Sequence, residues 1–298
     1  MTQHFLRMAD LTAAEHARIF ARARALKQAR KDGHLAQTLA GKTLVLVFEK
    51  ASTRTRLSFE AAMFQLGGHA IDLPASQSQL GRGEPLSDTA KIISGYADAV
   101  VFRTHADARL AEFAEASRVP VINGLSDGAH PVQVLADVFT LEEHLGPIAG
   151  KQVAFVGDGS SNMARSFCEA ARLFDFDLRI AAPQGFRPPE PDRAGARVRL
   201  TGDPAEAVDG ADAVVTDVWT SMGQEAEQAA RLAAFEGFCV DAALIARAKP
   251  GAIVLHCLPA HRGEEISAEV IDGPQSIVWA EAENRLHVQK ALLELLLT

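Results

Sequence analysis

The chain has 298 residues, of which 48% are hydrophobic, enough for two domains of ordinary size, each with its own core. A formal net charge of -8, without any long block of Lys or Arg, argues against a general affinity for nucleic acid. No apolar run approaches the roughly 18 residues of a membrane span, and Met1–His4 does not begin a signal pattern, so we expect a cytoplasmic protein without membrane partners.

Strand-like and helix-like segments alternate along the chain, which is typical of parallel sheets covered by helices. In the first half, helices are predicted over residues 12–31, 53–66 and 131–144, and strands over 43–48, 70–73, 99–103 and 121–123. The pattern restarts at Lys151, with a strand from Gln152, further strands over 178–181, 214–217 and 253–256, and a last helix over 286–297. Residues 186–199 are interpreted as a surface loop rich in Pro and Arg. We therefore predict an α/β protein of two domains, each a mostly parallel sheet flanked by helices, joined by inter-domain helices.

The segment Ser52-Thr53-Arg54-Thr55-Arg56 leads from the first predicted strand into a helix. Free N–H groups at a helix start attract anions, and hydroxyls with forked guanidinium groups complete a cage for phosphate oxygens. An ordinary Ser cap followed by surface charge is the alternative. Two arginines among three hydroxyls favour a site for a small phosphorylated molecule.

Three more polar residues of the first half fall at strand ends or helix starts. His130-Pro131-Val132-Gln133 has the layout of a capped helix start, and because histidine is an unusual cap, its ring either faces a ligand or is only structural. Arg103 follows the strand over 99–102, where a lone arginine is usually solvated. Together with Ser52 these side chains lie where parallel sheets bind ligands.

The second half carries a glycine-rich turn after its first strand, Gly157-Asp158-Gly159. The turn lacks the third glycine and the later acidic residue of a dinucleotide fingerprint, which argues against nucleotide binding. Asn162, at the start of the next helix, either offers its amide to a polar substrate or caps the helix.

Asp217 lies at the end of a predicted strand, and Ser221 follows four residues later in a loop that contains glycine. An aspartate there can hold an ammonium and loop N–H groups can hold a carboxylate, which together would recognise an amino acid; the alternative is a capped, solvated loop. Cys257, between a strand and a Leu-Pro turn, is by its surroundings a buried structural thiol. It is widely separated from Cys168 and Cys239, so no spacing indicates zinc or a disulfide framework.

Four segments resemble, in order and spacing, the motifs of the ornithine carbamoyltransferase family. They are Ser52–Arg56, His130-Pro131-x-Gln133, Asp217 with Ser221-Met222-Gly223, and His256-Cys257-Leu258-Pro259. The likeness spans nearly the whole chain. The first two motifs are shared with aspartate carbamoyltransferases and indicate carbamoyl phosphate, whereas the last two select ornithine. Val132 departs from the family's more common Cys or Thr, and Ser161-Asn162 replaces a common Asn-Asn pair.

The resemblance implies a role for each motif residue. Carbamoyl phosphate would be bound by Ser52, Thr53, Arg54, Thr55, Gln79, Arg103, His130, Gln133, the Leu258 carbonyl and Arg285. Ornithine would be bound by Asn162, Asp217, Ser221 and Met222. Arg103, His130 and Cys257 would be catalytic, with no metal or organic cofactor, in a homotrimer or an assembly of trimers in which Gln79 reaches across from a loop over 76–84.

The restart of the pattern at Lys151 places the domain boundary inside or just after the predicted helix over 131–145. With the roles that the resemblance implies, the chain divides into residues 1–135 for carbamoyl phosphate, 136–275 for ornithine, and a C-terminal helix over 276–298 that packs back on the first domain. Three alternative functions remain open at this point. They are a carbamoyltransferase for another acceptor such as acetylornithine, a dinucleotide-dependent oxidoreductase, and a non-catalytic protein that keeps the binding pocket.

Overall fold

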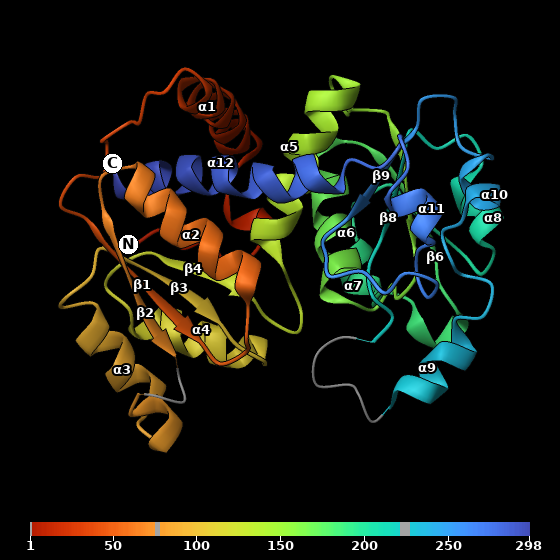
Figure 1. Ribbon diagram of the computed structural model, residues 1–298. Coiled ribbons are helices and arrows are strands. Elements are labelled where there is room, and N and C mark those ends of the chain that lie inside the picture. The colour runs from red at the N-terminus through yellow and green to blue at the C-terminus, as the bar shows by residue number, and fades with distance from the viewer. Residues whose placement is uncertain (1, 75–77, 221–226) are drawn as a thin grey trace. The chain divides into compact units, whose positions relative to one another are not determined.

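The computed structural model describes residues 2–74, 78–220 and 227–298, and it divides the chain into two compact units (Figure 1). Unit 1 is Met1–Ala136 with Glu283–Thr298, and unit 2 is Asp137–Ala282. The chain passes from unit 1 to unit 2 within helix α5 (Pro131–Leu145) and returns within helix α12 (Val278–Leu297). Because each unit holds one parallel sheet, the predicted α/β fold with connecting helices is confirmed.

Unit 1 is built on a four-stranded parallel sheet in the order β2-β1-β3-β4. The strands are β1 (Thr43–Phe48), β2 (His69–Pro74), β3 (Ala99–Arg103) and β4 (Val121–Leu125). The helices are α1 (Ala13–Lys31), α2 (Thr53–Gln65), α3 (Leu86–Ile93) and α4 (Asp107–Ala116), with short 3-10 turns η1 (Met8–Asp10) and η3 (Leu80–Arg82). The order reverses between β1 and β3, so ligands are expected at the carboxyl ends of these two strands.

Strand β1 is buried on both of its faces, which is why it reads as a continuous apolar run in the sequence. Val45 and Val47 pack into a core with apolar residues of α3 and α4, among them Phe113. Leu44 and Leu46 alternate to the opposite face, and α2 contacts β1 and β2. Because β1 is packed on both faces, its position is fixed, and this in turn fixes where the following segment, the start of α2, begins.

Unit 2 contains a five-stranded parallel sheet in the order β7-β6-β5-β8-β9. The strands are β5 (Gln152–Val156), β6 (Asp177–Ala181), β7 (Val198–Thr201), β8 (Ala213–Thr216) and β9 (Ile253–His256). The helices are α6 (Asn162–Phe174), α7 (Glu190–Arg193), α8 (Pro204–Val208), α9 (Gln228–Ala234), α10 (Ala242–Ile245) and α11 (Ala268–Ile271), with a 3-10 turn η4 (Gln184–Phe186). Here the order reverses between β5 and β8, which places the ends of β5, β8 and β9 at the ligand edge.

The interpretation of residues 186–199 as a surface loop is wrong in part. This stretch contains α7, and strand β7 begins in it at Val198. Strand β7 is four residues long, lies at the sheet edge and alternates with polar Arg199 and Thr201, so it shows no apolar run. The last helix also begins earlier than the predicted residue 286, at Val278. Among the described residues, no helix combines the length and the apolarity needed to cross a membrane.

A largely buried carboxylate, Glu294, attaches the C-terminal part of α12 to α1. Glu294 accepts hydrogen bonds from both Nε and Nη2 of Arg22, the latter at 2.8 Å, and from the Thr38 hydroxyl. Burial by itself raises the pKa of Glu294, but the hydrogen bonds outweigh it and leave the pKa below its ordinary value. The stabilisation is therefore present at neutral pH and is lost as the pH falls through that lowered pKa.

We predict that Arg22→Ala lowers the free energy of unfolding by about 1–2 kcal/mol, because a two-point contact to a buried carboxylate is lost. Arg30→Ala is the matched control, since Arg30 is on the same helix, is equally exposed and meets an exposed carboxylate, Glu283, at 3.7 Å. It should cost about 0.5 kcal/mol or less. Urea denaturation at pH 7 measures both, and equal losses would contradict the role given to Glu294.

Candidate active site

Ser52 is the N-cap of α2, and its hydroxyl accepts the Thr55 N–H at 3.3 Å. The two arginines of the motif then separate. Arg56 is exposed and pairs with Glu60 and with Asp72 of β2, each at 3.0 Å. Arg54 instead lies near enough to His130 to affect its titration. The two arginines of the motif therefore have different surroundings, with Arg54 near His130 and Arg56 in surface ion pairs.

A buried polar cluster lies behind the start of α2. Its members come from the end of β3, both sides of the α5 start, α2 and α12, and each is at most 6% exposed: Thr55, Arg103, His130, Gln133 and Arg285. The Arg285 Nη2 donates a hydrogen bond of 2.6 Å to the Thr55 hydroxyl, across 230 residues of sequence. The structure thus gathers into one place residues that the sequence distributes over most of unit 1.

His130 is neutral in this cluster. Burial lowers the pKa of its imidazole well below the ordinary value, and the guanidinium groups of Arg285, Arg103 and Arg54 lower it further. The His130 carbonyl accepts the N–H groups of Gln133 and Val134 and so begins α5 through its main chain. Three permanent positive charges around a buried neutral ring make a strong site for an anion with a polar neutral group attached.

Glu49 supports Arg103 and was missed in the sequence. It follows β1 directly, accepts hydrogen bonds from Thr104 and from Arg109, and donates its own N–H to the Arg103 carbonyl at 2.9 Å. Burial raises the pKa of Glu49, but the hydrogen bonds from Arg109 and Thr104 lower it by more. The net pKa is below the ordinary value, so the carboxylate stays charged. A charged residue directly after a buried strand was the signal that could have identified it.

Gln79 lies apart from the cluster. Its side chain is exposed, and its backbone carbonyl accepts the Arg82 and Glu84 N–H groups that shape the turn η3. Part of the predicted loop over 76–84 falls on residues 75–77, outside the described residues. Gln79 is thus placed on the surface of unit 1.

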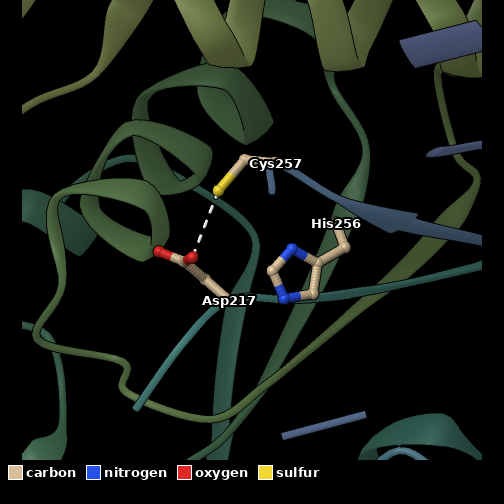
Figure 2. Close-up of side chains that lie close together, drawn as sticks. All are labelled: Asp217, His256 and Cys257. Carbon is tan, nitrogen blue, oxygen red and sulfur yellow. Dashed lines mark hydrogen bonds between the residues drawn. The ribbon is translucent and has the colours of Figure 1, made fainter. Parts of the chain in front are cut away.

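In unit 2, Asp217 follows β8 and Cys257 follows β9, and Figure 2 shows their side chains turned toward each other with the His256 ring beside them. The Cys257 Sγ donates to Asp217 Oδ1 at 3.1 Å, and the Val218 N–H donates to the same oxygen at 2.8 Å. Both of these hydrogen bonds therefore end on the same carboxylate oxygen of Asp217.

Burial changes the titration of both groups. It raises the pKa of the Cys257 thiol well above the ordinary value, and the Asp217 carboxylate raises it further, so Cys257 is a neutral donor rather than a thiolate. Burial also raises the pKa of Asp217, against the lowering by its hydrogen bonds. The pKa of Asp217 is therefore above the ordinary value of an aspartate.

The glycine-rich turn after β5 is occupied by the chain itself. Asp158 pairs with the buried Arg231 at 2.8 Å, and a carboxylate there would repel a dinucleotide's pyrophosphate. Gly159 is needed for packing, because a Cβ would lie 2.9 Å from the Phe186 carbonyl. Ser161, not Asn162, caps α6 through the Ala164 N–H at 3.2 Å. The amide of Asn162 is therefore not used as the cap.

The remaining predicted ornithine residues, Ser221 and Met222, lie outside the described residues. Leu258 has a left-handed backbone with φ +57°, and its N–H donates to His256 Nδ1 at 2.9 Å. The role of its carbonyl toward the carbamoyl group stays a prediction.

Asp217, His256 and Cys257 offer potential metal-ligand atoms within 4.8 Å of one another. Both ring nitrogens of His256 are engaged, one by the Leu258 N–H and one by Glu265, so metal binding would require the first of these bonds to break. The donor set as folded favours hydrogen bonding over metal ligation.

The chain is similar along its whole length to curated ornithine carbamoyltransferases. It is 55% identical to the one from Halorhodospira halophila, with 99% of each chain covered. It is 54% identical to one from Pseudomonas aeruginosa described as anabolic, covering 99% of this chain and 97% of that protein. The solved structure of ornithine carbamoyltransferase from Pyrococcus furiosus superimposes with a TM-score of 0.94 at 45% identity, covering 99% of this chain and 97% of that chain.

Both halves of the chain match the same family. Residues 3–143 match the carbamoyl-P binding domain of aspartate/ornithine carbamoyltransferase, and residues 149–296 match its Asp/Orn binding domain. With matches over both units and relatives above 50% identity, the chain belongs to the aspartate/ornithine carbamoyltransferase family.

Proposed function

We propose that the protein transfers the carbamoyl group of carbamoyl phosphate to the side-chain amine of L-ornithine, giving L-citrulline and phosphate for arginine biosynthesis. The observation that carries the proposal is the neutral His130 among three guanidinium groups. A phosphorylated substrate with a carbonyl next to its phosphate needs both features, positive charge for the phosphate and a neutral hydrogen-bond donor for the carbonyl. The relatives named above support ornithine as the acceptor.

We assign carbamoyl phosphate binding to the first domain, residues 1–135, with the C-terminal helix over 276–298 adding Arg285. The phosphate is bound by the α2 start and its guanidinium partners: Ser52, Thr53, Arg54, Thr55, Arg103 and Arg285. The free N–H groups of the first turn of α2 add to this attraction. Because Thr55 accepts from Arg285, the hydroxyl proton of Thr55 is left to donate to the substrate.

The carbonyl carbon is the centre of the reaction. His130 and Thr55 donate to its oxygen, Arg103 bridges this oxygen and the phosphate, and Gln133 with the Leu258 carbonyl holds the carbamoyl NH2. The neutral amine of ornithine attacks, a C–N bond forms, and the carbonyl electron pair moves onto the oxygen. When the tetrahedral intermediate collapses, the C–O bond to phosphate breaks, phosphate leaves with the electron pair, and the proton of the attacking amine passes to the leaving phosphate. Donors placed before the reaction stabilise the oxyanion without reorganising.

We assign ornithine binding to the second domain, residues 136–275. Asn162, Asp217, Ser221 and Met222 bind the backbone groups of the amino acid, and Asp217 with Cys257 orients the side-chain amine. The orientation of the Asp217 and Cys257 side chains supports this role, because a buried carboxylate and a neutral thiol donor offer complementary partners to an amine.

The direct test is formation of citrulline from carbamoyl phosphate and ornithine by the purified protein. Acetylornithine and other amines are offered in parallel as acceptors, and binding of NADH is measured on the same sample. Citrulline with ornithine alone supports the proposal. Turnover only with another acceptor would leave carbamoyl phosphate assigned to the first domain but would replace ornithine as the ligand of the second domain. Binding of NADH would favour the dinucleotide-dependent oxidoreductase.

Arg54→Ala should weaken the use of carbamoyl phosphate while the protein stays folded. Losing a charged contact to phosphate typically costs about 1.5–3 kcal/mol per hydrogen bond, so we expect kcat/KM for carbamoyl phosphate to fall about 10- to 100-fold. Arg56→Ala is the matched control, two residues away on the same helix but paired with Glu60 and Asp72. It should change kcat/KM less than about threefold. Equal effects of the two substitutions would remove Arg54 from the phosphate site.

We propose that the protein assembles as a homotrimer, in which Gln79 of one subunit completes the site of the next. Three observations on unit 1 support an assembly. Gln79 is exposed, so its side chain is accessible to a neighbouring copy. Leu57 and Phe64 are exposed on the same face of α2, 58% and 74%, and Ile71 is exposed on the edge strand β2. Exposed apolar side chains next to an open sheet edge are typical of a surface covered by another chain.

Mixing two inactive variants tests the role of Gln79 in trans. When Gln79→Ala and Arg54→Ala chains are dissociated, mixed and reassembled, about a quarter of the sites in random trimers should combine both native residues and regain activity. The control mixture is Arg54→Ala with Arg103→Ala, which should not complement, because both arginines lie near His130 of the same unit 1. Mixed trimers without recovery in the first mixture would show that Gln79 does not act in trans.

The pH dependence of ornithine use is set by the amine of the substrate. This amine resembles that of lysine, with a reference pKa near ~10.4, and only its neutral form attacks. His130 and Cys257 do not change their charge between pH 6 and 9, because the pKa of His130 lies well below 6.5 and that of the Cys257 thiol well above 9.0. Rising pH therefore increases the reactive fraction of the amine and leaves these two groups neutral.

We predict that the KM for ornithine falls by up to about tenfold for each pH unit between about 6 and 9. Cys257→Ser should raise the KM for ornithine by at least about threefold and leave that for carbamoyl phosphate nearly unchanged. The control is Cys239→Ser, a half-buried cysteine of the same unit. A flat pH profile would mean that the site binds the ammonium form and deprotonates it afterward, with the carboxylate of raised pKa, Asp217, as the base.

A further inference from the structure

Glu265 is a fully buried carboxylate that none of the proposed roles uses. It follows the turn after β9, is 0% exposed, and lies in unit 2 with its Oε1 directed at the His256 ring. A buried charge is costly unless it has partners, so its contacts show what it contributes.

The contacts of His256 determine which nitrogen of its ring carries the proton. The Leu258 N–H donates to Nδ1 at 2.9 Å, so Nδ1 is an acceptor without a proton. The proton of the neutral ring is therefore on Nε2, which donates to Glu265 Oε1 at 2.9 Å. Glu265 thus selects the tautomer that can hold Leu258.

Glu265 also holds the far end of the same turn. Its Oε1 accepts a second hydrogen bond, from the His261 N–H at 2.7 Å. The near end is held by the His256 N–H, which donates to the buried Glu281 at 2.9 Å. The turn from Cys257 to His261 is thereby held at both ends by buried carboxylates.

Leu258, in the middle of this turn, has an unfavourable backbone conformation. Its φ of +57° is in the left-handed region, which a branched side chain rarely adopts. Such a residue persists where its surroundings force it, and strained residues of this kind concentrate at functional sites. The hydrogen bond from its own N–H to His256 holds its backbone, and its side chain packs against the core of unit 2.

We propose that Glu265 is a positioning residue for the reaction. Through the tautomer of His256 it holds the Leu258 backbone, and so it orients the Leu258 carbonyl and the neighbouring Cys257 thiol toward the substrates. This inference rests on the proposed function, in which those two groups bind the carbamoyl NH2 and the amine. Glu265 itself touches neither substrate.

Two substitutions of equal size separate its hydrogen bonds from its bulk. Glu265→Gln keeps an oxygen that accepts from His256 and His261, whereas Glu265→Leu fills the same volume without an acceptor. We expect Gln to retain kcat within about threefold and Leu to lower it by at least about tenfold. The inhibition constant of inorganic phosphate should stay unchanged in both, because the phosphate residues belong to unit 1. A merely structural role would weaken phosphate inhibition together with kcat.

Two substitutions of His256 then separate its two bonds. In His256→Asn the side-chain oxygen takes the place of Nδ1 and can accept from Leu258, whereas in His256→Gln the side chain reaches Glu265 but leaves the Leu258 N–H without its acceptor. If the Leu258 bond matters for the reaction, Asn retains more activity than Gln. The opposite order would overturn the chain of contacts proposed here.

A measurement that needs no turnover separates this inference from the proposed function. Alkylation of Cys257 by chloroacetamide, followed by mass spectrometry, reports how firmly the turn is held, and the fully buried Cys168 on α6 reports general unfolding. Glu265→Leu should speed alkylation of Cys257 at least about fivefold and leave Cys168 unreactive, with Gln near wild type. Unchanged alkylation of Cys257 in Glu265→Leu, or equal effects of Leu and Gln, would overturn the proposal. Absence of citrulline with wild-type protein would overturn the function and not the positioning.

Discussion

The structure of unit 1 depends on one electrostatic arrangement, three guanidinium groups gathered around a buried neutral imidazole. Arg54, Arg103 and Arg285 repel one another, and desolvation of His130 keeps it from adding a fourth charge. Two of the contacts that hold them are the hydrogen bond from Arg285 to the Thr55 hydroxyl and the hydrogen bond from the Glu49 N–H to the Arg103 carbonyl. An anion is the partner that this arrangement attracts, so binding of a phosphate would relieve repulsion that folding imposes.

Unit 2 uses the opposite arrangement at the same kind of sheet edge. A carboxylate, Asp217, is buried beside a thiol, Cys257. Burial and the neighbouring carboxylate raise the pKa of the thiol, whereas the hydrogen bond from the thiol lowers the pKa of Asp217 against the rise that burial causes. The first unit thus suits a substrate that is negative and the second a substrate with an amine. Burial contributes to both sites, since it is the largest cause of the lowered pKa of His130 and of the raised pKa of Asp217.

The sequence predicted the parts of the fold and site that depend on local pattern. Strands β1 and β3 have the predicted bounds, because buried parallel strands are continuous apolar runs, and the rule for strand ends correctly grouped Arg103 and His130. The contact of Arg285 with Thr55 could not come from pattern, because 230 residues separate them and only the family resemblance indicated Arg285. The buried carboxylate Glu265 was missed because a Glu-Glu pair in a loop is normally solvated, and nothing in the sequence separates buried Glu265 from its more exposed neighbour Glu264.

The discontinuous composition of unit 1 has a consequence for its synthesis on the ribosome. Residues 1–136 emerge first, then all of unit 2, and only afterward the piece 283–298 that supplies Arg285 and Glu294. Because chains are made at about 5–20 residues per second, the N-terminal portion waits roughly ten seconds or more for its last helix. During that interval α1 lacks the carboxylate that binds Arg22, and His130 lacks one of the three guanidinium groups around it. The first-made part of unit 1 therefore completes its contacts only when residues 283–298 have been made.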